Sequence, residues 1–296
     1  MKISVVIPAY RAARTIGRAV GSVLAQTHPP FEILVVDDGS PDDIATALAP
    51  FGNQVKLIRK ANGGAGSARN LGIDRSSGDV VAFLDADDFW EPQKLQRQCA
   101  ILSGNPDIGL TSSTWLEQSP GLAREAIALD TKELDRPLSP VRDRISKLAS
   151  MIWTSTVAVR RQIVESMRFD PDLRTAQDRE LWIRIVAAHT VFICSDPLAT
   201  AVLESGSLSR TNLDRDCTNM LRVIRRHHAL LGPRQSRTWE TQVYRRWAGQ
   251  YLATGESRAA IRPALKRLAR QPLSLEGWWI AAKSLVRGVV RPTPQT

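Results

Sequence analysis

Three carboxylates, those of Asp85, Asp87 and Asp88, directly follow the apolar run Val80 to Leu84. A strand without polar alternation is typical of the middle of a parallel sheet covered on both faces, and such sheets bind ligands at the carboxyl ends of their strands. Carboxylates this close together repel one another, and a bound divalent cation would relieve the repulsion. The cluster therefore predicts a metal-assisted ligand site at the end of this strand.

A second pair of carboxylates, Asp37 and Asp38, ends the apolar run 33–36. Since parallel strands end at the same edge of a sheet, we expect this pair to open into the same crevice as the first cluster. Asp42 and Asp43 precede a short helical pattern, and we expect them to cap that helix, where the positive end of the dipole favours carboxylates.

Strand and helix patterns alternate through the first hundred residues. The expected strands are 3–7, 33–36, 55–58 and 80–84. The expected helices are 16–24, 42–49, one that follows a glycine-rich turn at 62–66 and runs to about residue 75, and 92–102. Alternation of this kind predicts an α/β fold with a mostly parallel central sheet flanked by helices.

The pattern loosens after residue 103. Prolines interrupt residues 117–143, which we expect to form either a mobile loop over the active site or a poorly specified connection. A strand is expected at 152–159 and a helix from about Asp178, and everything from about residue 212 onward has helical periodicity.

The positive charge is concentrated at one end of the chain. The net charge is +10, but residues 217–296 alone hold 15 basic and 3 acidic residues, a net of +12, and the remainder holds 25 basic and 27 acidic residues. A basic tail on a nearly neutral body indicates that the tail meets an anionic surface or polyanion.

The expected compartment is the cytoplasm. Cys99, Cys194 and Cys217 lack C-x-x-C spacing, which predicts a reducing environment and no cysteine zinc site. The apolar run after Lys2 is too short for a signal peptide, and no apolar run reaches the about 18 residues of a membrane span. We expect a cytoplasmic protein, attached to the inner face of the cell membrane only peripherally if at all.

Four motifs together resemble those of a known family. They are Ser4-Val5-Val6-Ile7-Pro8-Ala9-Tyr10, Val35-Val36-Asp37-Asp38-Gly39-Ser40, Asn62-Gly63-Gly64 with Ala68-Arg69-Asn70, and Leu84-Asp85-Ala86-Asp87-Asp88. In this order and spacing, residues 1–210 resemble the family 2 glycosyltransferases of the GT-A fold. The resemblance implies a nucleotide-sugar-binding half at 1–103 and an acceptor-binding half at 104–210, followed by a basic helical region at 211–296.

The resemblance also implies a role for each matching residue. The implied nucleotide-sugar-binding residues are Pro8, Ala9 and Tyr10 as a floor under the nucleotide, Asp38 on the base, Gly64 in a donor-facing turn, Arg69, and Asp85, Ala86 and Asp87 near the ribose, sugar and diphosphate. The implied cofactor is Mn²⁺ or Mg²⁺, with Asp87 and Asp85 as ligands, and carboxylate and phosphate oxygens are the ligands that these cations prefer. Two placements of Arg69 stay open, one reaching the diphosphate or a site aspartate and the other on the helix surface.

The segment Thr175 to Trp182 resembles the family's catalytic segment. Members usually have Glu-Asp where this chain has Gln177-Asp178, so the aspartate is kept and its neighbour is neutral. The resemblance implies that Asp178 is the general base that takes the proton of an acceptor hydroxyl, so that this hydroxyl attacks the anomeric carbon and inverts its configuration. The alternative is that Asp178 only caps its helix.

The implied reaction moves a sugar from a nucleotide-diphosphate donor, with a UDP-sugar favoured, to a sugar or lipid-linked acceptor in cell-surface polysaccharide or glycolipid assembly. One alternative is a sugar nucleotidyltransferase, although that class usually has a Gly-rich loop bearing Lys or Arg where this chain has Pro8-Ala9-Tyr10. The other alternative is a catalytically inactive nucleotide-sugar-binding protein.

The last helical pattern, 278–291, is amphipathic. Its cations recur every four residues on one face: Lys283, Arg287 and Arg291. Its apolar residues lie on another face: Trp279, Ala282, Val286 and Val289. Such a helix can lie on an anionic membrane, or it can pack its apolar side on the tail's own bundle. No nucleic-acid partner is expected, because the acidic crevice would repel a polyanion and no nucleic-acid-binding module is recognisable.

Overall fold

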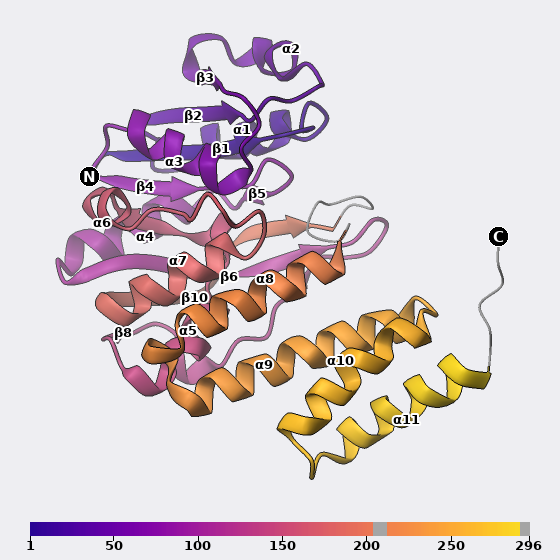
Figure 1. Cartoon of the computed structure of the whole chain (residues 1–296). Coiled ribbons are helices and arrows are strands. Elements are labelled where there is room, and N and C mark those ends of the chain that lie inside the picture. The colour runs from indigo at the N-terminus through magenta and orange to yellow at the C-terminus, as the bar shows by residue number, and fades with distance from the viewer. Residues whose placement is uncertain (204–211, 291–296) are drawn as a thin grey trace. The chain divides into compact units, whose positions relative to one another are not determined.

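The computed structural model describes residues 1–203 and 212–290, with side chains up to Val286 (Figure 1). The chain divides into two compact units, residues 1–207 and 208–296. Across the described ranges, no helix combines the length and the hydrophobicity that a membrane span requires.

Four parallel strands in the order β3-β2-β1-β4 form the N-terminal half of the first unit (Figure 1). Their bounds are β1 Ile3–Ala9, β2 Glu32–Asp37, β3 Lys56–Arg59 and β4 Val80–Phe83. The connecting helices are α1 Ile16–Leu24, α2 Ile44–Leu48 and α3 Ala65–Arg75, with a 3₁₀ helix η1 at Ala49–Gln54, and α4 at Lys94–Gly104 follows. The alternation predicted for this part of the sequence is confirmed.

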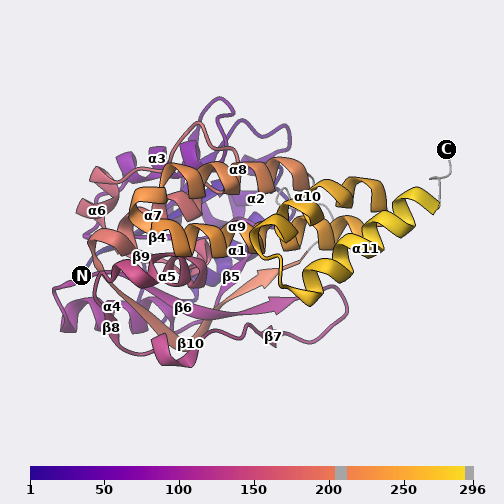
Figure 2. The same ribbon diagram turned by 60° about the horizontal axis from the view of Figure 1, so that its bottom comes forward.

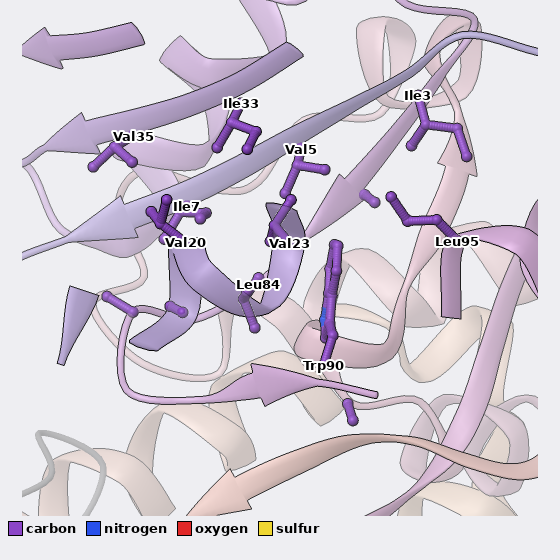
Figure 3. Close-up of a cluster of buried hydrophobic side chains, with 14 of the residues drawn as sticks. Ile3, Val5, Ile7, Val20, Val23, Ile33, Val35, Leu84, Trp90 and Leu95 are labelled. Carbon is purple, nitrogen blue, oxygen red and sulfur yellow. The ribbon is translucent and has the colours of Figure 1, made fainter. Parts of the chain in front are cut away.

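Different helices cover the two faces of these strands. Side chains alternate along β1, so Ile3, Val5 and Ile7 lie on the face that packs against Val20 and Val23 of α1 (Figure 3). The intervening residue Val6 lies on the opposite face, against α3. A Cβ atom added at Gly72 of α3 would lie 2.3 Å from Val6 Cγ1, so glycine is needed for this close approach.

Beyond β4 the sheet becomes mixed and continues in the order β4-β9-β6-β10-β5. The bounds are β5 Phe89–Trp90, β6 Ile108–Gln118, β7 Glu125–Ala126, β8 Pro137–Leu138, β9 Ala158–Arg160 and β10 Thr190–Val202. The long strands β6 and β10 pair in parallel (Figure 2), whereas β9 is antiparallel to both β4 and β6. The helices of this half are α5 Ile145–Met151, α6 Arg161–Ser166 and α7 Gln177–Ala188.

The segment 117–143 is a connection held by a buried carboxylate. It completes β6, adds the short strands β7 and β8, and includes the 3₁₀ helices η2 (Thr131–Glu133) and η3 (Arg142–Arg144). Glu133 is 3% exposed and forms ion pairs with Arg136, Arg144 and Lys147. Burial alone would raise the pKa of Glu133. Hydrogen bonds from Lys147 and Arg144 outweigh this effect and keep the pKa of Glu133 below its ordinary value.

The strand expected at 152–159 is wrong over its first part. Residues Thr154–Thr156 form a 3₁₀ helix, η4, and within the predicted range the strand β9 begins only at Ala158. The hydroxyl of Thr156 donates to Trp153 O at 2.6 Å, and such local side-chain bonds compete with strand pairing.

The second unit is helical throughout its described residues, as the periodicity predicts. Its helices are α8 Leu213–Arg226, α9 His228–Ala253, α10 Ser257–Arg270 and α11 Leu275–Val290. Helix α9 bends at Gly232, whose φ is 70°, just before Pro233. Helices α9, α10 and α11 lie side by side (Figures 1 and 2) around a core of mostly small residues: Ala248, Leu252, Ala260, Ala264, Ile280 and Ala281.

Candidate active site

The predicted donor residues lie at one edge of the parallel strands. Ala9 at the end of β1 pairs with Asp37 of β2, and Val6 of β1 pairs with Phe83 of β4. Asp38 and Asp85, which follow these two neighbouring strands, therefore flank the segment in which β1 ends. Pro8, Ala9 and Tyr10 make up that segment, and Ala9 is buried whereas Pro8 and Tyr10 are half-buried.

Asp38 organises the glycine-rich turn. It is 2% exposed; its Oδ1 accepts from Lys60 Nζ at 2.7 Å and from Gly63 N at 2.9 Å, and its Oδ2 accepts from Gly64 N at 2.7 Å. Gly64 has a φ of 89°, so a side chain there would be strained. The buried carboxylate thus fixes the turn that the resemblance assigns to the donor. Lys60 has no counterpart in the motifs, and its only sequence signal is a cation just before the Gly-rich turn.

A cavity of about 590 Å³ opens beside this turn. Its lining residues are Asp37, Gly39, Ser40, Pro41, Asp42, Asp43, Arg59 and Lys60. Neither Asp85 nor Asp178 lines this cavity. We therefore look for the reactive groups at Asp85 and Asp178 and not in the cavity.

The sequence predicted that Asp42 and Asp43 both cap the following helix, but only one of them does so. Asp43 caps α2 by accepting from Thr46 N at 3.0 Å. Asp42 accepts from Ala13 N at 2.8 Å instead, so the capping prediction is confirmed for Asp43 and wrong for Asp42.

The turn after β4 contains one buried and two half-buried carboxylates. Asp88 is 5% exposed and accepts from Ser155 Oγ at 2.6 Å and from Val202 N at 3.2 Å. Burial and the neighbouring charges of Asp87 and Asp85 together hold the pKa of Asp88 well above its usual range. Asp88 therefore retains its proton to higher pH than an ordinary aspartate, which limits the charge repulsion within this turn.

Ser155 joins this turn to the second half of the sheet. Its hydroxyl also accepts from Asp85 N at 3.1 Å, and its carbonyl oxygen accepts from Trp90 Nε1 at 2.6 Å. Ser155 is fully buried in η4, a segment that the sequence predicted as a strand. No motif marked it as a site residue.

Arg69 reaches the acidic turn from helix α3. It is 4% exposed, and its Nη2 lies 2.5 Å from Asp85 Oδ1. Its guanidinium also stacks over the ring of Phe169, 5.3 Å from the centroid. Of the two placements left open by the sequence, the one on the helix surface is wrong.

Arg69 also connects the donor residues to the start of α7. With its amide oxygen toward Arg69, Gln177 accepts from Arg69 Nη1 at 3.3 Å and donates to Leu173 O at 3.3 Å. Gln177 is 7% exposed and adjoins Asp178 in the sequence. One guanidinium thus spans the distance between Asp85 and the segment that carries the predicted base.

Asp178 lies in the first turn of α7 and is half-buried. The N-cap residue of this helix is Ala176, in the left-handed conformation with a φ of 61°. Asp178 Oδ1 accepts from Arg179 N of the first turn at 2.8 Å, so its carboxylate does satisfy a free N–H at this helix end, as the capping alternative predicted. The next side chain, Arg179, donates from Nη1 to Ala149 O at 2.5 Å and Ile152 O at 3.0 Å. The position of Asp178 is therefore set on one side by Gln177 and on the other by Arg179.

The carboxylates after β4 fit a divalent cation that is shared with a diphosphate. In the parts of the chain that the structure describes, no group of three or more His, Cys, Asp or Glu side chains is arranged as a metal site. Mg²⁺ and similar cations need only one or two carboxylates when phosphate oxygens complete the coordination. Asp87 and Asp85, both half-buried, are the residues of this turn that could hold such a cation.

Comparisons with known proteins identify the family of the chain. The profile described as "Glycosyl transferase family 2" matches residues 4–167. An uncharacterized glycosyltransferase of Nostoc sp. is 38% identical over 173 residues, which are 56% of this chain and 53% of that protein. The succinoglycan biosynthesis protein ExoW of Rhizobium meliloti is 30% identical over 99% of this chain and 91% of its own length.

The fold is shared with a solved glycosyltransferase structure. The crystal structure of S. aureus TarS 1-349 in complex with UDP-GlcNAc superposes with a TM-score of 0.67 at 18% identity, over 97% of this chain and 89% of that one. The α/β fold of GT-A type with a C-terminal helical region is therefore confirmed. With a family match over more than half of its residues and a relative that spans nearly its whole length, the chain belongs to glycosyltransferase family 2.

Proposed function

We propose that this glycosyltransferase moves a sugar from a UDP-sugar to an acceptor hydroxyl with inversion at the anomeric carbon, using Mn²⁺ or Mg²⁺. The observation that carries the proposal is the Arg69 guanidinium, which lies 2.5 Å from Asp85 and faces Gln177 beside Asp178. This contact supports the proposal because it links the acidic turn to Gln177, the neighbour of the proposed base in the sequence. TarS, which shares the fold, is described in complex with UDP-GlcNAc, which favours a UDP-sugar as the donor.

We assign donor binding to residues 1–103. Asp38 Oδ1 already accepts two hydrogen bonds, but Oδ2 accepts one in the described structure, so it can accept another from an N–H of the base. Pro8, Ala9, Tyr10 and the turn at Gly64 would surround the nucleotide. The sugar and the diphosphate would lie over Ala86, between the side chains of Asp85 and Asp87.

The bound cation would supply positive charge where the leaving diphosphate becomes more negative. Asp87 would hold it, with Asp85 as the second carboxylate. Arg69 orients Asp85 by a charge-assisted hydrogen bond, and Ser155 fixes the backbone of the same turn.

We assign acceptor binding to residues 104–210, of which 204–210 lie outside the described residues. Asp178 would accept the proton of the acceptor hydroxyl as its oxygen forms a bond to the anomeric carbon. The bond from that carbon to the diphosphate oxygen breaks on the opposite side, and its electron pair leaves with the diphosphate. Arg179 and Gln177 keep the start of α7 in place for this step.

The acceptor we propose is a sugar or lipid-linked saccharide in cell-surface polysaccharide or glycolipid assembly, at the cytoplasmic side of the membrane. ExoW, named as a succinoglycan biosynthesis protein, is similar over nearly the whole chain and supports this class of product. The family match favours glycosyl transfer over the nucleotidyl transfer that the sequence left as an alternative.

Calorimetry against UDP, GDP and dTDP, each with and without Mn²⁺, tests the proposal. We expect UDP to bind in the presence of Mn²⁺ and much more weakly without it, and Asp87→Asn to lose the metal dependence. Asp107→Asn, at an exposed position, is the matched control. If no nucleotide binds in a metal-dependent way, the proposed donor site is wrong.

A further inference from the structure

Helix α11 has an inner face made of small residues. Ile280, Ala281 and Ser284 are at most 5% exposed, and Gly277 is also buried. Ile280 and Ala281 belong to the same core as Ala248 of α9 and Ala260 and Ala264 of α10. This inner face is therefore fully used in packing α11 on its own bundle.

Ionic contacts fix the rotation of α11 about its axis. Glu276 in its first turn accepts from Arg245 of α9 and from Arg267 of α10, each at 2.8 Å. Ser284 Oγ donates back to Ile280 O at 2.7 Å, which satisfies the one hydroxyl on the inner face. With the start of the helix tied to two neighbours, the opposite face must point outward.

The outward face carries large apolar side chains. Leu275 is 87% exposed, Trp278 57%, Trp279 58% and Val286 60%, and Leu273 in the preceding turn is 95% exposed. The spacing of the four helical residues places them on one side of a helix, opposite the inner face. Contiguous apolar surface of this kind on a soluble domain marks an interaction site.

Helix α11 therefore packs on its own bundle, as one alternative predicted, but through this inner face and not through the predicted apolar face. Trp279, Ala282 and Val286, which the sequence placed on the apolar face, are all exposed. The side chains of Arg287, Val289 and Arg291, which belonged to the same prediction, lie outside the described residues.

Cations lie on α11 itself and on its neighbour α10. Lys283 Nζ lies 4.3 Å from the centroid of the Trp279 ring. On α10, Arg262 and Lys266 are exposed, and Leu265 between them is 47% exposed. Residues 217–296 carry a net charge of +12. A partner of this surface must therefore be both apolar and anionic.

We infer that the outer face of α11, residues 273–286, docks on an anionic lipid bilayer. Leu273, Leu275 and Val286 would enter the acyl boundary, and Trp278 and Trp279 would lie at the level of the headgroups, where tryptophan is enriched. The cations of α10 and α11 would attract anionic headgroups, and this attraction adds to the binding free energy from the buried apolar side chains. This docking does not depend on the proposed transfer reaction.

Sedimentation of the full chain with vesicles tests the docking. The probes are vesicles of phosphatidylcholine alone and of phosphatidylcholine mixed with phosphatidylglycerol. We expect binding to the anionic vesicles that weakens as salt rises, and a loss of about tenfold or more in the double variant Trp278→Ser, Trp279→Ser. The matched control is Leu122→Ser, at a 66% exposed leucine of the first unit, which should bind like the unchanged chain.

Two further measurements keep the outcome clear. Thermal unfolding shows whether the Trp278→Ser, Trp279→Ser variant folds. If this variant does not fold, the double variant Arg262→Glu, Lys266→Glu takes its place, and it should also weaken binding to anionic vesicles. The inference is overturned if the full chain does not bind anionic vesicles. It is also overturned if folded variants bind these vesicles as strongly as the unchanged chain. Light scattering that shows self-association lost in the double variant, without vesicle binding, would assign the face to a second copy of the chain.

Discussion

The guanidinium of Arg69, on helix α3, holds Asp85, in the turn after β4, at 2.5 Å. Because the same guanidinium faces Gln177, the geometry of the acidic turn and that of the α7 start are coupled. A substitution in the acidic turn should therefore change the geometry at the start of α7, and a substitution at Gln177 should change the geometry of the acidic turn.

Asp178→Asn should remove catalysis and spare donor binding. The amide cannot accept the proton of the acceptor hydroxyl, and a positioned base contributes about 10²–10⁴-fold to such reactions. We expect transfer or donor hydrolysis to fall by about 10³-fold, while calorimetry with UDP and Mn²⁺ gives an affinity within about twofold of the original. Asp172→Asn, an exposed aspartate before α7, is the control. Equal losses of binding and turnover would make Asp178 structural.

Gln177→Glu should strengthen metal-dependent donor binding. A carboxylate at this position would share Arg69 with Asp85, and the weaker hold on Asp85 would leave its charge more available to a cation. We expect the affinity for UDP in the presence of Mn²⁺ to rise by about threefold.

Gln177→Leu is the matched control for that change, because it fills similar space without adding charge. It should lower stability by about 1 kcal/mol through the lost amide contacts and leave the Mn²⁺ dependence unchanged. A Gln177→Glu chain whose UDP binding is no more metal-dependent than that of Gln177→Leu would contradict the coupling.

Glu32 should make the fold sensitive to acid. Burial works against ionisation, but hydrogen bonds from Ser4, Ser77 and Lys56 outweigh it and lower the pKa of Glu32 to about 2, from an ordinary value of 4.5. A lowered pKa stabilises the folded state above pH 4.5, and this contribution is lost as the pH falls from there through about 2.

Glu32→Gln should therefore cost about 2 kcal/mol of unfolding free energy at pH 7, and the difference from the original chain should shrink toward pH 3. Urea unfolding at several pH values measures it. Glu165→Gln, which affects an exposed pair with Arg161, should change stability by less than about 0.5 kcal/mol. A gap that stays constant with pH would show that Glu32 does not titrate as described.

Gly72→Ala should destabilise the packing of α3 on β1. The added Cβ would lie 2.3 Å from Val6 Cγ1, and overpacking of this kind costs about 2 kcal/mol. Gly17→Ala in α1 meets no atom within 4 Å and should be neutral or slightly stabilising. Adding Val6→Ala to Gly72→Ala should remove the clash, so thermal unfolding that shows no such relief would contradict the stated contact.

The first hundred residues were predictable because the strands β1, β2 and β4 are short, mostly apolar and almost completely buried. The strand β6 was missed because Thr111, Ser112, Ser113 and Thr114 give it a polar sequence although all four are buried. Their hydroxyls find partners that only the folded structure supplies, such as Thr156 for Ser112 at 2.6 Å. The strand β10 was missed because Asp196 and Pro197 interrupt it at an irregular register with β6.

The candidate site was predictable where one motif follows one strand, as at Asp38 and Asp85. The links that join its parts were not, because Arg69 and Gln177 lie on different helices and no local pattern relates them. Ser155 is a further case, since a lone serine in a polar stretch carries no signal that it will support two aspartates.

The two contacts of Asp88 also affect the order in which the parts of the first unit can fold. Its partners Ser155 and Val202 lie 67 and 114 residues further along the chain. Contacts so distant in sequence form late in folding, and a chain emerging from the ribosome folds its N-terminal segments first. A nascent chain that has released only β1 to β6 therefore contains Asp85, Asp87 and Asp88 but not the groups that fix their turn, so completion of this turn has to await β10.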